Sequence, residues 1–224
     1  RDDSERLERA VAHPLDPESL VEGARAARAL GFDNQARRWL EDAVWLADVD
    51  PRASREAFFL LAEFDSGWAQ RRIVRVHVFA DQEIRAEPGW RIRMRLLWRS
   101  LSVGLDPLLS AAFVPVTLQS FETDPGHVTL RSLDADFRAS AGALPTEGLI
   151  AALTQTPAPK TRGQWRLGQA GFLGRDLIVR LRPGEIASRV LAHEILHIFG
   201  GVHISDKVGS LMNPGGESMN LDPA

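Results

Sequence analysis

Three of the chain's six histidines lie close together, in the stretch LAHEILHIFGGVHISDKVGSLMNPGG. His193 and His197 are four residues apart in a segment of helical patterning, so their imidazoles stack on one face of the helix. At that spacing, two ring nitrogens can bind one metal ion at about 2.0–2.1 Å. Glu194 follows the first histidine and points to the adjacent sector, within reach of a metal-bound water. The pattern predicts a catalytic metal centre on a helix.

A glycine pair follows this helix and predicts the return of a third ligand. Gly200 and Gly201 tolerate positive φ and stop the helix, so the chain turns sharply after His197. The turn brings His203 toward the same ion, which makes these two histidines and His193 the predicted ligands of one Zn²⁺. The alternative is a surface helix with solvated histidines. The apolar residues between them disfavour it, because a helix that is apolar around most of its girth is buried.

Residues 193–203 spell H-E-x-x-H-x-x-G-x-x-H with every fixed position filled, and here the chain resembles the metzincin superfamily of zinc endopeptidases. A second feature of that superfamily, a methionine turn downstream, is matched by SLMNP at Ser210–Pro214. The resemblance implies one catalytic zinc ion, Glu194 as the general base and Met212 as an apolar floor beneath the histidines. It covers about residues 71–224, with strong motifs only after Leu191.

The subfamily is less sharply marked than the superfamily. The Ser-Leu-Met-x-Pro turn looks like that of the matrixins, but Ile204 stands where matrixins have serine. Pro214 occupies the position where astacins and serralysins place a tyrosine ligand, and this chain has no tyrosine. It also has no cysteine, whereas archaemetzincins follow the motif with cysteines. The resemblance therefore implies a divergent metzincin nearest the matrixins.

The same resemblance implies a strand at the sheet edge that pairs with substrate. In metzincins an antiparallel edge strand comes just before the last strand, and here GFLG precedes DLIVRL. We expect Gly171, Phe172, Leu173 and Gly174 to bind an extended polypeptide by β-augmentation, and Pro214 to help form the wall of the specificity pocket. The alternative is a hairpin that does not touch substrate.

The elements that must hold this centre begin with a helical region over residues 1–68. Asp16 with Pro17, and again Asp50 with Pro51, predict capped helix starts, and Gly31 predicts a helix end. The spacing of small and large apolar residues partly resembles tetratricopeptide repeats, although there is room for barely two units. We favour helices packed on the neighbouring domain, with a protein partner for them as the alternative.

Residues 69–224 predict the catalytic domain. Residue type favours strands at IVRVHVFA, FVPVTLQSF and DLIVRL, and the apolar run GLIAALT is typical of a buried strand. Helical periodicity is clearest in PGWRIRMRLLWRSLSVG and PGEIASRVLAHEILHIFG. This order predicts an α/β (α+β), metzincin-like domain with a twisted, mostly parallel sheet and two long helices, preceded by the small all-α region.

The composition and the first residues of the chain indicate which partners and which location to expect. The 224 residues are 44% hydrophobic and 25% charged with a net charge of −3, which gives no reason to expect nucleic acid as a partner. No apolar run is long enough to predict a membrane span. The first residues, RDDSERLER, look like a trimmed start, and metzincins are mostly exported. We therefore expect a periplasmic or extracellular location, with the cytoplasm as the alternative.

Two functions from different classes fit these residues. The first is a zinc-dependent endopeptidase that hydrolyses polypeptides with metal-activated water and Glu194 as the base. The second is a catalytically weak or inactive metzincin-like binding module joined to a helical adaptor. Glu194 favours the first, because a module without turnover has no need of the base. His13, His77 and His127 lie outside the motif and are expected to be structural or exposed.

Overall fold

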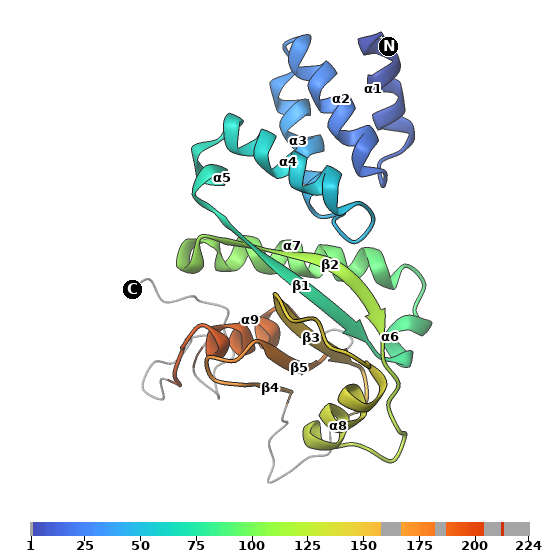
Figure 1. Cartoon of the computed structure of the whole chain (residues 1–224), viewed down its shortest axis with the longest axis vertical. Helices are drawn as coiled ribbons and strands as arrows, with labels where there is room; N and C mark the ends of the chain where they lie inside the picture. The colour runs from blue at the N-terminus through green and yellow to red at the C-terminus, as the bar shows by residue number, and fades with distance from the viewer. Residues whose placement is uncertain (1, 158–166, 182–186, 204–211, 213–224) are drawn as a thin grey trace.

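The structure is a computed structural model that describes residues 2–157, 167–181, 187–203 and 212 (Figure 1). Its helices are α1 (Asp3–Ala12), α2 (Pro17–Ala29), α3 (Asp33–Val44), α4 (Pro51–Phe64), α5 (Ser66–Gln70), α6 (Gln82–Ala86), α7 (Trp90–Leu109), α8 (Leu130–Ser140) and α9 (Ala187–Ile198). Its strands are β1 (Arg72–Ala80), β2 (Ala111–Ser120), β3 (Leu149–Thr154), β4 (Gly168–Ala170) and β5 (Asp176–Arg180).

The strands form one five-stranded sheet in the order β2-β1-β3-β5-β4. The neighbouring strands from β2 to β5 are parallel, and only β4 runs antiparallel, against β5. β3 lies at the centre of the sheet, and every one of its residues is buried. A strand covered on both faces has no position that favours a charged side chain, which explains the continuous run LIAALT.

Successive residues along the strands point to opposite faces of the sheet, and each face packs in its own apolar core. On the first face, Val78 and Val179 pack in a cluster with residues of α7 and α9. On the second face, Phe79 and Ile150 pack in a cluster with residues of α8. The sheet is therefore a layer between helices, and α9 packs directly on it.

The N-terminal helices cover the second face where it is formed by β2. Ala112 and Val114 of this strand belong to one apolar cluster with Leu40 of α3, Trp68 of α5 and residues of α2 and α4. Figure 1 shows α1–α4, coloured blue to cyan, at one end of the molecule and α8 at the other. The helical region and the sheet therefore share a core. The predicted boundary at residue 68 falls inside α5, and the division into two domains stays a prediction.

Ion pairs join the same two regions. Arg95 of α7 donates two hydrogen bonds to the carboxylate of Asp48, with N–O distances of 2.8 and 2.7 Å. The two side chains are only 12% and 4% exposed. One turn further along α7, Arg99 donates to Asp42 at 2.7 Å. Because a bidentate pair fixes orientation as well as distance, α7 is held against α3 and the turn that follows it.

Most of the expected architecture is confirmed. The sheet is mostly parallel, the two expected helices are present as α7 and α9, and a helical region precedes them. Asp16 and Asp50 cap α2 and α4 through hydrogen bonds from backbone N–H groups. Among the described residues, no helix combines the length and the apolar character that crossing a membrane requires.

The expected position of the edge strand is wrong. The antiparallel strand is β4 at Gly168–Ala170, and the predicted segment Gly171–Gly174 is the turn that follows it. The backbone explains the difference, because Leu173 has a φ of 54°. That value lies in the left-handed region, which a β-strand does not contain.

We predict that Asp48→Ala lowers the free energy of unfolding by about 3 kcal/mol, because it leaves the poorly solvated guanidinium of Arg95 without its partner. Urea unfolding followed by circular dichroism measures the loss. The control is Glu147→Ala, which breaks an ion pair with Arg75 whose side chains are 79% and 55% exposed. The control is expected to cost less than about 1 kcal/mol. Equal losses in both variants would contradict a structural role for the Arg95–Asp48 pair.

Candidate metal centre

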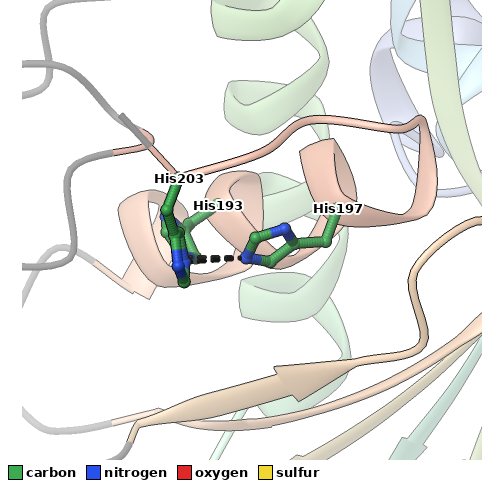
Figure 2. A group of neighbouring side chains, drawn as sticks. All are labelled: His193, His197 and His203. Carbon is green, nitrogen blue, oxygen red and sulfur yellow. Dashed lines mark hydrogen bonds between the residues drawn. The ribbon is translucent and has the colours of Figure 1, made fainter. Parts of the chain in front are cut away.

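Helix α9 presents the first two histidines because its other side is anchored in the core. Leu191 and Ile195 are fully buried in the cluster formed with the sheet and α7. His193 and His197, four residues apart, are half-buried beside them. Figure 2 shows that their imidazoles extend to the same side of the helix. The helical spacing predicted from the sequence therefore places both rings as expected.

The third histidine returns through a Schellman turn at the end of α9. The N–H of Gly200 donates to the carbonyl of His197 at 3.1 Å, and the N–H of Gly201 donates to the carbonyl of Leu196 at 2.7 Å. Gly200 has a φ of 90°, which disfavours any residue with a Cβ atom. A Cβ on Gly201 would lie 2.9 Å from the carbonyl oxygen of Leu196. The glycine pair is thus required for the reversal that brings His203 back.

The three Nε2 atoms form a nearly equilateral triangle. The Nε2–Nε2 distances are 3.1 Å for His193–His203, 3.2 Å for His193–His197 and 3.1 Å for His197–His203. A tetrahedral zinc ion with Zn–N bonds of about 2.0–2.1 Å separates its nitrogen ligands by about 3.3 Å, so the spacing fits this metal. Within the described part of the chain, no other cluster of three or more His, Asp or Glu side chains could hold an ion.

The protonation of His197 also suits a metal ligand. Its Nδ1 lies 2.9 Å from the carbonyl oxygen of Gly201. A carbonyl only accepts, so Nδ1 carries the proton and donates it. In a neutral imidazole, Nε2 then has a free lone pair directed into the triangle. A hydrogen bond from the second ring nitrogen is the usual means of orienting a zinc-binding histidine, so the donor set fits zinc chemically as well as geometrically.

Glu194, the predicted base, is buried with 6% of its surface exposed. Its side chain lies against Gly168, the first residue of β4, because a Cβ built on that glycine would be 2.5 Å from Glu194 Oε1. The sequence did not indicate Gly168, which is one of 18 glycines and belongs to no motif. The structure thus places the side chain of Glu194 beside the edge strand and adds a neighbour that sequence reasoning missed.

The segment predicted to bind substrate lies next to the three clustered histidines. It is a tight turn, in which the N–H of Gly174 donates to the carbonyl of Gly171 at 2.8 Å. The N–H of Leu173 donates to the carbonyl of His197 at 3.3 Å, which ties the turn to a predicted metal ligand. Phe172 and Leu173 are 59% and 68% exposed. Their contact with substrate remains a prediction.

The predicted methionine turn is described at one residue. Met212 is buried, with 7% of its surface exposed. The residues on either side of it, including Pro214, lie outside the described residues. The roles of Met212 as the floor of the site and of Pro214 in the specificity pocket therefore stay predictions.

Two histidines outside the triangle are held in other ways. His77 of β1 is buried, and its Nδ1 lies 3.1 Å from Thr117 Oγ1. Burial lowers the pKa of His77 from its ordinary value of 6.5, and the charge of Arg75 lowers it further. His127 lies 2.8 Å from Asp136, and this hydrogen bond raises the pKa of His127. Both fit the expectation of a structural or exposed histidine.

Comparisons with known proteins give low similarity. No protein-family model matches the chain, and no curated protein matches it in sequence. An archaemetzincin from Methanopyrus kandleri aligns at 19% identity and a TM-score of 0.46, over 65% of this chain and 83% of that chain. An archaemetzincin from Archaeoglobus fulgidus complexed with malonate aligns at 14% identity and a TM-score of 0.34, over 62% of this chain and 85% of that chain.

A chaperone–substrate complex aligns at 12% identity and a TM-score of 0.44, over 67% of this chain and 28% of that chain. At identities and TM-scores this low, the assignment of the site rests on the geometry of its own residues. The relationship to matrixins inferred from the sequence stays a prediction.

We predict that the full chain binds one zinc ion and that His203→Ala lowers the zinc affinity at least about 100-fold, because one of three ligands is lost. Competition with a chromogenic chelator measures the affinity. His203 is exposed, so its truncation is expected to leave the fold intact. The control is His127→Ala, which removes a histidine far from the triangle in sequence and should leave zinc binding unchanged. Equal zinc affinity in all three proteins would contradict the site.

We predict that the ring of His77 titrates below pH 6.5 and that the ring of His127 titrates above pH 6.5. NMR spectra of the histidine rings, recorded as a function of pH, measure both titrations. For His77 the unfolded chain takes up the proton first, so its stabilising contribution is present above about pH 6.5 and is lost as the pH falls. For His127 the contribution is present below about pH 6.5 and is lost as the pH rises through the raised pKa. Coincident titration of the two rings would contradict both assignments.

Proposed function

We propose that the chain is a zinc-dependent endopeptidase of the metzincin type. The observation that carries the proposal is the triangle of three Nε2 atoms, 3.1–3.2 Å apart, with the buried Glu194 on the same helix. When bound, a zinc ion would supply Lewis-acid chemistry, which would activate a peptide carbonyl group and water for hydrolysis. The three histidines are the residues that would hold it.

Glu194 supplies the acid–base group. As a carboxylate it accepts the proton of the attacking water, and as an acid it delivers that proton to the amide nitrogen that leaves. It follows His193 directly on α9, so its side chain starts within one residue of a predicted ligand. Because only 6% of its surface is exposed, the proton that it holds is shielded from bulk water. One residue therefore serves both proton transfers.

The edge strand supports a polypeptide as the substrate. Among the described residues, β4 is the last strand of the sheet and pairs only with β5. Addition of an extended peptide to the open side of an edge strand is a recurrent recognition mode, in which backbone hydrogen bonds supply affinity without demanding a sequence. Because Gly168 of β4 touches Glu194, a peptide bound along this strand would pass close to the base.

We predict that the zinc-loaded chain cleaves an unfolded protein, and that Glu194→Gln reduces kcat by at least about 1,000-fold while one zinc ion stays bound. Glutamine keeps the size of the side chain but cannot accept the proton. Mass spectrometry of the fragments locates the cleaved bonds, and a chelator must abolish cleavage. The matched control is Glu147→Gln, a change at an exposed carboxylate that should leave the rate unchanged.

Two outcomes would contradict the proposal. Cleavage by Glu194→Gln at the wild-type rate would show that another group transfers the proton. Stoichiometric zinc without cleavage of any unfolded substrate would favour the inactive binding module.

A further inference from the structure

Gly168 and Glu194 approach each other more closely than any other residue at position 168 would allow. A Cβ built on Gly168 would lie 2.5 Å from Oε1, 2.7 Å from Cγ and 2.8 Å from Cδ of Glu194. Real Cβ atoms essentially never show contacts shorter than 3.0 Å. The side chain of Glu194 therefore occupies the space that a side chain at position 168 would need.

The alternation of side chains along β4 explains why the space beside Gly168 faces α9. Gly168 and Ala170 are two residues apart, so they face the same side of the sheet. Ala170 packs against the core cluster that contains α9, whereas Gln169 between them is exposed. A side chain at position 168 would thus also point toward α9. There is room for the methyl group of Ala170. There is no room for one at position 168, because the carboxylate of Glu194 lies there.

The backbone of Gly168 does not itself demand glycine. Its φ lies outside the left-handed region that favours glycine, in contrast to Gly148 and Gly200. The extended conformation of a strand is open to every residue with a Cβ atom. The reason for glycine at this position is therefore the neighbouring side chain and not the local conformation.

An added methyl group would displace the proposed base, because the three atoms nearest to it all belong to Glu194. The close atoms include Cγ and Cδ as well as the carboxylate oxygen, so a small rotation of the terminal group cannot relieve the contact. The Glu194 side chain would have to change rotamer, which moves the carboxylate by more than about 1 Å. A base must lie within about 2.6–3.2 Å of the proton it takes, and a misplacement of about 1 Å costs on the order of 100-fold in rate.

We propose that Gly168 is a positioning residue, whose missing side chain leaves the room in which Glu194 holds its carboxylate for proton transfer. This inference rests on the proposed function, because it gives Glu194 its role as the base. It adds that the edge strand has a second task besides pairing with substrate. The strand forms one wall of the space that holds the base.

The first test separates proton transfer from metal and substrate binding. We expect Gly168→Ala to bind one zinc ion with wild-type affinity, to keep the wild-type KM and to lose at least about 100-fold in kcat. The matched control is Gly104→Ala, the same change on α7, where a Cβ would meet nothing within 4 Å. The control should keep the wild-type kcat. A wild-type kcat for Gly168→Ala would overturn the proposal, and so would a loss of zinc.

The second test needs neither zinc nor activity. Melting temperatures are measured in the presence of a chelator for the wild type, Gly168→Ala, Glu194→Ala and the double variant. We expect Gly168→Ala to lower the melting temperature by about 2–4 °C when Glu194 is present and by less than about 1 °C when alanine replaces it. Equal losses in both backgrounds would mean that the strand itself needs glycine, which would overturn the proposal.

The two tests distinguish failure of the inference from failure of the proposed function. If the wild-type chain binds zinc but cleaves nothing, the endopeptidase assignment fails, and the melting temperatures alone decide whether Gly168 makes room for Glu194. If the wild-type chain cleaves and Gly168→Ala cleaves equally well, the assignment stands and the inference fails.

Discussion

The proposed zinc site depends on three imidazole Nε2 atoms that lie only 3.1–3.2 Å from one another. The chain must therefore hold the rings together by rigid packing. Two of them come from α9, whose far side is fixed in the core by Leu191 and Ile195. The third is returned by the Schellman turn, and the bond from His197 to Gly201 orients the ring between the two elements.

α9 can hold the imidazole rings in place only if the sheet on which it packs is itself covered on both faces. The N-terminal helices provide part of that cover. A parallel sheet must be covered on both faces. α8 covers part of the second face, and α2–α5 cover β2 through Ala112 and Val114. The bidentate pair between Arg95 and Asp48 ties the same helices to α7. The N-terminal helices therefore cover part of the same sheet on which α9 packs from the other face.

Sequence patterns predicted the features that depend on residues close together in the chain. The i, i+4 histidines, the glycine pair and the Asp-Pro helix starts were visible for that reason. The edge strand was misplaced because the resemblance gave only the order of the elements, and the short segment GQA contains no residue that favours a strand. The predicted segment GFLG contains Leu173 at a positive φ, which a β-strand does not allow. Gly168 was invisible because its contact, Glu194, lies 26 positions away, and only the packing of β4 on α9 brings the two together.

The predicted metal ligands and the proposed base are thus positioned by different means. The triangle depends on α9 and the turn after it, whereas the carboxylate of Glu194 also depends on the space left by Gly168 on β4. A change in the edge strand can therefore remove proton transfer and leave the three histidines intact. It follows that zinc binding by itself does not distinguish an endopeptidase from an inactive relative. The distinction lies in whether the strand keeps the carboxylate within reach of the water.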